Sequence, residues 1–269
     1  MRSFLNLNSI PNVAAGNSCS IKLPIGQTYE VIDLRYSGVT PSQIKNVRVE
    51  LDGRLLSTYK TLNDLILENT RHKRKIKAGV VSFHFVRPEM KGVNVTDLVQ
   101  QRMFALGTVG LTTCEIKFDI DEAAAGPKLS AIAQKSVGTA PSWLTMRRNF
   151  FKQLNNGTTE IADLPRPVGY RIAAIHIKAA GVDAVEFQID GTKWRDLLKK
   201  ADNDYILEQY GKAVLDNTYT IDFMLEGDVY QSVLLDQMIQ DLRLKIDSTM
   251  DEQAEIIVEY MGVWSRNGF

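Results

Sequence analysis

"VRVELDG" at residues 47–53 and "VEFQIDG" at residues 185–191 are two closely similar segments of one chain. In each stretch apolar side chains alternate with polar ones, and an alternation of period two predicts a half-buried β-strand. The closing Asp-Gly pair tolerates the positive φ angles that a tight turn needs. Each stretch therefore predicts a strand that runs into a turn.

Three further pairs of segments repeat in the same order. "LPIGQTY" (23–29) recurs as "LPRPVGY" (164–170), "NDLILE" (63–68) as "NDYILE" (203–208), and "IKFD" (116–119) as "LKID" (244–247). The offset between partners drifts along the chain, as expected of two copies of one domain that differ in loop length. We interpret the chain as an internal duplication, with an N-terminal arm and first domain over residues 1–135 and a second domain over 136–269.

Short alternating segments separated by Gly, Pro, Asn and Asp fill both halves and predict β-sandwiches or barrels. A helix is expected to follow the second Asp-Gly, with the inward stripe Trp194, Leu197, Leu198, Ala201 and Tyr205. Residues 58–70 predict a shorter counterpart in the first half. A third helix is expected to begin at Thr96 as N-cap, with Leu98, Val99, Met103 and Leu106 facing inward.

Two stretches lack the alternation. Residues 1–18 break their apolar side chains with Asn, Ser and Pro, which predicts an extended arm that a neighbour could order. Small residues, Gly and Pro dominate 121–142, which predicts the boundary between the copies near residue 135. The later part, with Trp143, Met146, Phe150 and Phe151, is too apolar for a free linker and is expected to pack on a domain or a partner.

The composition is that of a folded pair of domains with no net charge. The 269 residues are 44% hydrophobic, and Lys+Arg and Asp+Glu both number 32. The zero formal net charge argues against a protein whose whole surface grips nucleic acid. No apolar run is long enough for a membrane-spanning helix. Cys19 and Cys114 have no metal-binding spacing and are expected to be reduced, packed thiols.

Catalytic motifs are missing from the sequence. The three histidines, His72, His84 and His176, show no metal-ligand spacing, and no nucleotide-binding or nucleophile motif is present. We therefore predict no catalytic residues and a protein that is not an enzyme.

Two groups of residues are candidate sites. A basic run could face anionic lipid headgroups or a partner, although a solvated loop is the simpler interpretation; it holds Arg71, Lys73, Arg74, Lys75 and Lys77. Two acidic clusters offer oxygen ligands for a structural calcium ion, with solvated carboxylates as the alternative. Their members are Asp119, Asp121 and Glu122, and Asp202, Asn203 and Asp204.

Two tandem β-rich copies, a helix after the Asp-Gly strand of each, an extended arm and no catalytic motif together resemble a double-jelly-roll major capsid protein. Over its full length the chain resembles the major capsid protein of small marine, membrane-containing icosahedral bacteriophages of the corticovirus type. The resemblance implies a mainly β fold of two tandem jelly-roll β-sandwiches with short inserted helices.

The resemblance also implies partners. Three chains would form a trimer, a pseudo-hexagonal capsomer that tiles an icosahedral shell around an internal lipid membrane and a double-stranded DNA genome. Neighbouring capsomers, viral membrane proteins or lipid headgroups, and a vertex spike or penton protein would contact it, without sequence-specific nucleic acid binding. The protein would be made in the bacterial host cytoplasm and reside in the virion. No cofactor is required for chemistry, and calcium would be structural.

Two other classes of protein share some of these features. A trimeric sliding clamp, a ring that encircles DNA, has repeated domains, but the predicted helices lack the positive face that would hold phosphates. A two-domain cupin enzyme needs a cluster of histidines for its metal, which this sequence does not contain. DNA loading that depends on salt, turnover that depends on metal, and shell formation would separate the three.

Overall fold

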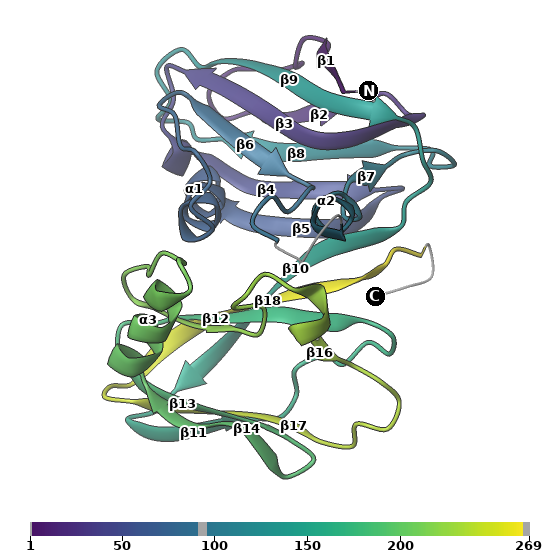
Figure 1. Cartoon of the computed structure of the whole chain (residues 1–269). Helices are drawn as coiled ribbons and strands as arrows, with labels where there is room; N and C mark the ends of the chain where they lie inside the picture. The colour runs from purple at the N-terminus through teal and green to yellow at the C-terminus, as the bar shows by residue number, and fades with distance from the viewer. Residues whose placement is uncertain (1, 91–95, 266–269) are drawn as a thin grey trace. The chain divides into compact units, whose positions relative to one another are not determined.

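The computed structural model describes residues 2–90 and 96–265, which form two compact units. The first consists of residues up to Met146 with a short stretch that begins at Val263, and the second of Arg147–Gly262. Each unit has two antiparallel sheets, with a helix beside them (Figure 1).

The first unit pairs its strands into two sheets. One has the order β1-β9-β3-β6, with β7 also on β3: β1 (Ser3–Asn6), β9 (Lys128–Val137), β3 (Gln27–Ser37), β6 (Val80–His84) and β7 (Leu106–Gly107). The other has the order β2-β8-β4-β5: β2 (Ser18–Lys22), β8 (Cys114–Ile120), β4 (Ile44–Leu51) and β5 (Arg54–Thr61).

The second unit repeats this arrangement strand for strand. One sheet has the order β10-β18-β12-β15, with β16 on β12: β10 (Trp143–Leu154), β18 (Glu252–Val263), β12 (Arg171–Lys178), β15 (Thr218–Asp222) and β16 (Val233–Leu234). The other has the order β11-β17-β13-β14: β11 (Gly157–Ile161), β17 (Leu242–Ser248), β13 (Val182–Ile189) and β14 (Thr192–Lys199). Adding nine to each strand number of the first copy gives the second, so the duplication extends to the whole topology.

The two repeated segments form equivalent hairpins, one in each unit. Asp52 and Asp190 have φ angles of 48° and 49°, and the glycines after them 74° and 75°. Successive residues with positive φ suit the tight turn that joins β4 to β5 and β13 to β14. The Asp52 carboxylate accepts from the amides of Thr112 (2.6 Å) and Thr113 (2.9 Å). Asp190 accepts in the same way from the two amides that precede β17.

Alternating burial shows how each core is built. In β8 the side chains of Cys114, Ile116, Phe118 and Ile120 are buried and those between them are not, and β17 shows the same alternation. Cys19 and Cys114 are buried free thiols, as predicted. Burial raises the pKa of Cys114 to about 12, so the thiol stays protonated near neutral pH.

A helix follows the hairpin in each copy, but its start was predicted too early in both, by four residues in the first copy, where residues 58–61 end β5, and by six in the second. α1 (Leu62–Arg71) begins after Thr61, whose amide is capped by Asp64. In the second copy α3 (Lys200–Gln209) begins six residues after Trp194, because β14 keeps pairing with β13 as far as Lys199. Trp194, Leu197 and Tyr205 are therefore exposed rather than inward. The buried side chains of α3 are Asn203 and Leu207.

Parts of the two stretches without alternation also form strands. Within 121–142, β9 pairs with β3 along its whole length, and its small side chains alternate weakly. β1 pairs with β9 from Ser3 to Asn6, so this part of the predicted arm is a strand of its own sheet. The strand takes the place that β10 takes in the second copy. The division after residue 135, which lies near the end of β9, stays a prediction.

The third helix, α2 (Thr96–Arg102), exists where it was expected. Val99, however, is 65% exposed and does not face inward, whereas Leu106 is buried in β7. The side chain of Leu98 lies outside the described residues. In the part of the chain that the structure describes, no helix has the length and apolar character needed to cross a membrane.

Candidate functional site

The helix of each copy is fixed to its sheet by a buried asparagine. Asn69 donates to the Ser82 carbonyl oxygen in β6 (2.9 Å) and accepts from Arg74 (3.1 Å). Asn203 donates to the Thr220 carbonyl oxygen in β15 (3.0 Å) and accepts from Arg195 (2.7 Å). Because both the oxygen and the nitrogen of its side chain are hydrogen-bonded within the unit, Asn203 holds the helix to its sheet and is not available as a metal ligand.

Next to α1, a buried ionic cluster forms around Glu89. Oε1 of Glu89 accepts from Arg74 Nη2 (2.8 Å) and Arg87 Nε (3.1 Å), and Oε2 accepts from Arg74 Nε (3.2 Å). His72 Nδ1 lies 3.6 Å from the same carboxylate. The side chains of Arg74, Arg87, Glu89 and His72 are all at most one-tenth exposed. The cluster thus ties the end of α1 to the chain that follows β6.

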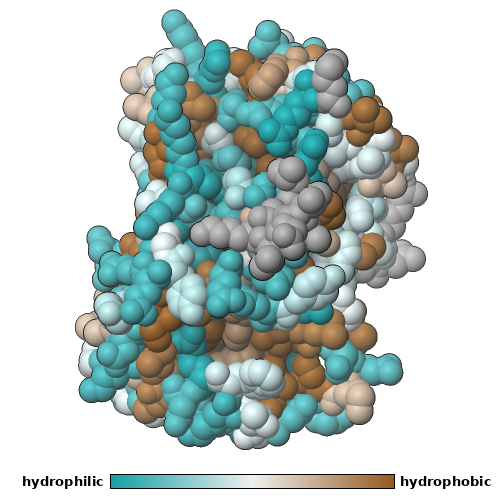
Figure 2. All heavy atoms as spheres, viewed as in Figure 1, coloured by the Kyte–Doolittle hydropathy of each residue, from teal (hydrophilic) through white to brown (hydrophobic). Residues whose placement is uncertain are grey.

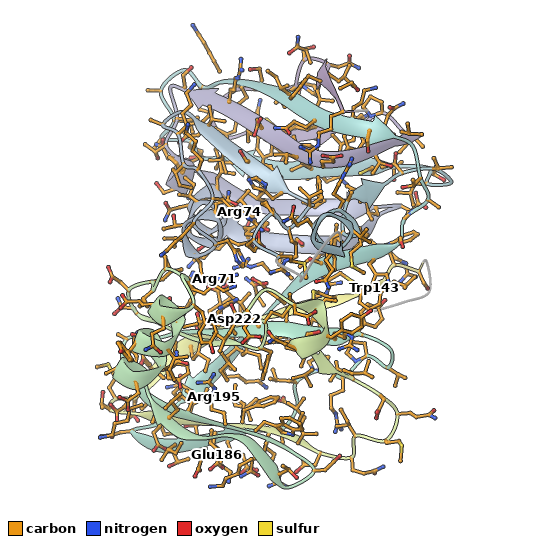
Figure 3. The ribbon with its side chains drawn as sticks, in the orientation of Figure 1. Arg71, Arg74, Trp143, Glu186, Arg195 and Asp222 are labelled. Carbon is orange, nitrogen blue, oxygen red and sulfur yellow. The ribbon has the colours of Figure 1, made fainter. Side chains whose placement is uncertain are left out.

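The basic run is therefore divided between two environments. Arg71 is buried, and Arg74 belongs to the Glu89 cluster. Both arginines are labelled in Figure 3. Lys73, Lys75 and Lys77 are exposed, and Lys73 has a φ angle of 50°. These three lysines, which we call the lysine loop, are the part of the run that can meet an anionic partner.

Burial keeps the histidines near this cluster neutral. It lowers the pKa of His84 to about 4, with Arg74 adding to the effect, and it holds the pKa of His72 well below the usual range. The pKa of Glu89 is also lowered well below its usual value by His72, Arg74 and Arg87, which outweigh its own burial.

The first unit is expected to lose stability in mild acid. The folded pKa of His84, about 4, lies below the unfolded value of 6.5, so the unfolded state binds more protons between these pH values. The free energy of unfolding should fall by roughly 3 kcal/mol as pH drops through this window. Hydrogen exchange of the β6 amides from pH 7 to pH 4, after correction for the intrinsic rates, would measure it.

The variant His84→Gln supplies the control for this pH dependence. It removes the titrating group, so its stability should vary less over the same window, with His72 and Glu89 accounting for the remainder. An equal loss in the wild type and in His84→Gln would show that His84 does not carry the effect.

The first acidic cluster points its carboxylates at neighbouring side chains. Asp119 accepts from Ser18 Oγ (2.6 Å) and Asn46 Nδ2 (2.8 Å), and these hydrogen bonds lower its pKa. Asp121 is paired with Lys45 and accepts from the Ala123 amide (2.8 Å), which lower its pKa. Glu122 is exposed.

The second acidic cluster is spread around α3. Asp202 is exposed, and Asp204 pairs with Lys200 at 2.5 Å. Among residues 2–90 and 96–265, no three His, Cys, Asp or Glu side chains are grouped so that they could hold a metal ion. Calcium binding by either cluster stays a prediction, and a single copy does not bring the ligands together.

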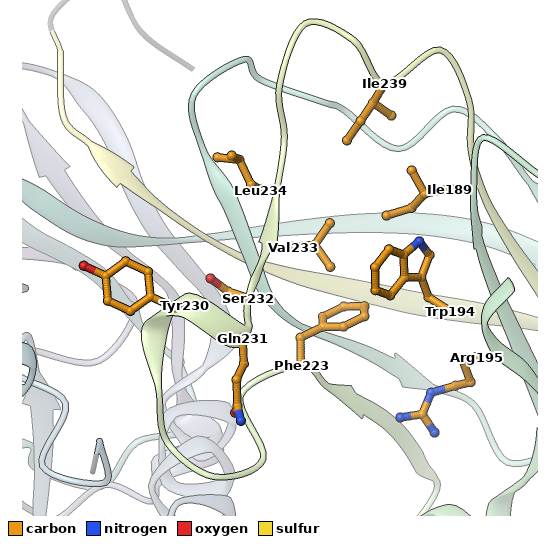
Figure 4. A pocket seen from close by; sticks show the side chains of 10 residues that line it. All are labelled: Ile189, Trp194, Arg195, Phe223, Tyr230, Gln231, Ser232, Val233, Leu234 and Ile239. Atoms are coloured by element: carbon orange, nitrogen blue, oxygen red, sulfur yellow. The ribbon is translucent and has the colours of Figure 1, made fainter. Parts of the chain in front are cut away.

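A groove in the second unit was not predicted. It has a volume of about 430 Å³ and lies between β14 and the chain that follows β15 (Figure 4). Its lining is mainly apolar and aromatic: Ile189, Trp194, Arg195, Phe223, Tyr230, Gln231, Ser232, Val233, Leu234 and Ile239. Apolar residues gather on the same face of this unit in Figure 2.

Exposed aromatic rings form the rim of the groove. Trp194 is 70% and Tyr230 76% exposed, and the Arg171 guanidinium lies 6.0 Å from the centre of the Tyr230 ring. Surface patches of Trp, Tyr and Arg are typical of protein interfaces. A sequence signal existed in Trp194, but its apparent helical spacing with Leu198 and Ala201 suggested a core position instead.

Both halves of the chain match one protein family. Residues 4–136 match the viral coat protein P2 N-terminal domain, and residues 144–264 match the viral coat protein P2 C-terminal domain. Together these matches cover nearly all of the two units.

Solved capsid structures share the fold at low sequence identity. The crystal structure of the STIV MCP superimposes with a TM-score of 0.67 at 10% identity, covering 98% of this chain and 97% of that one. The quasi-atomic PBCV-1 virus capsid gives a TM-score of 0.61 at 11% identity, covering 99% and 97%. The fold is thus mainly β and matches that of double-jelly-roll capsid proteins. The chain belongs to the viral coat protein P2 family and is a structural capsid protein rather than an enzyme.

Proposed function

We propose that three copies of this coat protein form a trimer, which acts as a pseudo-hexagonal capsomer of an icosahedral shell. The observation that carries the proposal is the strand-for-strand repetition of the two jelly rolls. Three chains with two similar sandwiches each present six similar sides, so a ring of three-fold symmetry can be packed almost like a hexagon. Such capsomers would contact neighbouring capsomers along their sides and a penton or spike protein at the vertices.

The shell is proposed to surround a lipid membrane and a double-stranded DNA genome, as in bacteriophages of the corticovirus type. The full-length resemblance of the sequence supports this part of the proposal. The lysine loop, with three exposed ammonium groups, is the candidate for contact with lipid headgroups or viral membrane proteins. Changing all three lysines to Glu should abolish binding to anionic vesicles, whereas matched changes at Lys22, Lys60 and Lys128 should leave it intact. If the lysine-loop variant binds the vesicles as the wild type does, the lysine loop has no such role.

Calcium is proposed as a structural ion at contacts between copies. Asp121 and Glu122 lie on the chain that follows β8, and Asp202 lies on the outer side of α3. Calcium takes six to eight oxygen ligands, and Asp119, Asp121 and Asp204 already use carboxylate oxygens for partners within the chain. Ligands from two copies would complete such a site.

Sedimentation of the purified chain tests the trimer and the ion together. In physiological salt with calcium, the expected mass is three times that of the 30.2 kDa chain, with larger assemblies at higher concentration. Removing calcium with a chelator should dissociate the larger assemblies. The variant Asp121→Asn should show the same dissociation in the presence of calcium. A strict monomer under every condition would contradict the proposed capsomer.

A further inference from the structure

The groove of the second unit has an apolar floor that the core holds in place. The Phe223 ring, which lines it, packs against the ring of Phe187 with centroids 5.0 Å apart, and Phe187 is fully buried. Ile189 from the end of β13 and Val233 from β16 lie close to Phe223 (Figure 4), and both are half-buried. Since β13 and β16 belong to the two different sheets of the jelly roll, the sandwich itself fixes the groove before any ligand binds.

The size and lining of the groove suit a small ligand with an aliphatic chain. Its volume of about 430 Å³ lies within the roughly 300–1,000 Å³ that is typical of small-molecule sites. Trp194 is 70% and Leu234 46% exposed, so an apolar chain in the groove would remove much apolar surface from water. Aliphatic side chains and aromatic rings supply most of the lining: Ile189, Val233, Leu234, Ile239, Trp194 and Phe223.

The charge of the lining indicates the sign of the ligand. Among the described residues that line the groove, only Arg195 is charged, and the carboxylates of residues 223–241 are not among them. Nη1 of Arg195 donates to Oδ1 of Asn203 (2.7 Å), a neutral amide that is 1% exposed. Asp204 of the same helix pairs with Lys200. The guanidinium is thus anchored by a neutral group rather than by a carboxylate.

We propose that the groove of the second jelly roll binds a fatty acid, with the acyl chain along the apolar lining and the carboxylate on Arg195. A guanidinium has several N–H donors in one plane, so those that do not bind Asn203 can hold the two oxygens of a carboxylate. A cationic head group would be repelled by Arg195, and an uncharged one would leave the guanidinium without a counter-ion. The site does not depend on the proposed capsomer, since every lining residue belongs to one unit of one chain.

Calorimetric titration of the full-length chain with laurate, dodecanol and acetate tests both parts of the proposed ligand. Laurate has the chain and the carboxylate, dodecanol the chain alone, and acetate the carboxylate alone. We expect saturable binding of a single laurate per chain, binding of dodecanol that is weaker by about tenfold or more, and no measurable binding of acetate. Laurate that binds no more tightly than dodecanol, or that does not saturate at one per chain, would overturn the inference.

Two variants assign the affinity to the two parts of the groove. Arg195→Gln should weaken laurate binding by about tenfold or more and leave dodecanol binding unchanged, because it removes only the charge. Trp194→Ala should weaken the binding of both ligands. The control Arg243→Gln, which alters a partly exposed arginine paired with Glu160 in the same unit, should change neither.

The fold of Arg195→Gln needs its own measurement, because Arg195 also holds Asn203 of α3. Unaltered hydrogen exchange of α3 and β13 amides would establish that the variant is folded. Should the exchange of α3 rise, Trp194→Ala decides, since Trp194 is exposed and its removal leaves the core intact. Wild-type affinity for laurate in Trp194→Ala would overturn the inference.

Sedimentation with and without laurate separates a ligand from a neighbouring chain as the occupant of the groove. The affinity for laurate should be the same in dilute and in associated protein. If laurate binding weakens as the chains associate, and laurate dissociates the assembly, the groove is a contact between copies and the inference fails. A strict monomer that binds laurate would contradict the proposed capsomer and leave the fatty-acid site supported.

Discussion

Replacing Glu89 with glutamine is expected to destabilise the first jelly roll by about 3–5 kcal/mol, because it removes the anion from a buried cluster of cations. Arg74 binds Glu89 through two nitrogens and Arg87 through one, and all three side chains are at most one-tenth exposed. Glutamine has nearly the same size, so the loss would report charge rather than packing. Hydrogen exchange of α1 and β6 amides would measure it locally, without assuming that two units unfold together.

The control for Glu89→Gln is Glu122→Gln, an exposed glutamate of the same unit, measured in calcium-free buffer. An exposed carboxylate should change stability by no more than about 0.5 kcal/mol. A double-mutant cycle with Arg74→Gln should show strong coupling, since the second change removes a charge that the first left unpaired. If the Glu89→Gln variant were as stable as the wild type, the cluster would have to be accessible to water.

Replacing Phe104 with alanine is expected to cost about 3–5 kcal/mol, the usual penalty for deleting a buried aromatic side chain. Phe104 is 1% exposed, and its ring meets the Trp143 ring edge-on with centroids 6.4 Å apart. It belongs to the connection between α2 and β7. Hydrogen exchange of the neighbouring β3 amides would report the loss.

Trp194→Ala, at the groove of the second unit, provides the matched comparison. Because Trp194 is 70% exposed in a single chain, its removal should change the stability of dilute, unassociated protein by less than about 1 kcal/mol. The prediction for Phe104 would be contradicted if both substitutions had the same small effect, since the buried ring would then contribute no more than the exposed one.

Local patterns predicted most of the strands because period-two alternation reports one buried face directly. β8 and β17 show that alternation without a break, and the repeated Asp-Gly turns fixed the register of two hairpins. The predicted helix at 194–205 failed for a non-local reason. The ladder between β13 and β14 outweighs the helical spacing of the apolar residues as far as Lys199.

The candidate sites depended on longer distances in the chain. Arg74 and Glu89 are fifteen residues apart and meet only because β6 lies between them, so the basic run alone could not reveal the cluster. The same residue types, Lys and Arg, proved exposed at Lys75 and buried at Arg74. The groove could not be inferred from the sequence, because its lining comes from β13, β14 and the chain that follows β15, which only the fold brings together.

The order of strands within each sheet has a consequence for how the protein is made. In both copies the ninth strand lies between the first and the third: β9 between β1 and β3, and β18 between β10 and β12. Neither sheet can be completed until its last strand has left the ribosome, and such distant pairing makes folding slow. The first jelly roll can close once Val137 is free, while the second waits with unpaired edges until β18 arrives. Aggregation of newly made chains should therefore arise mainly from the second jelly roll.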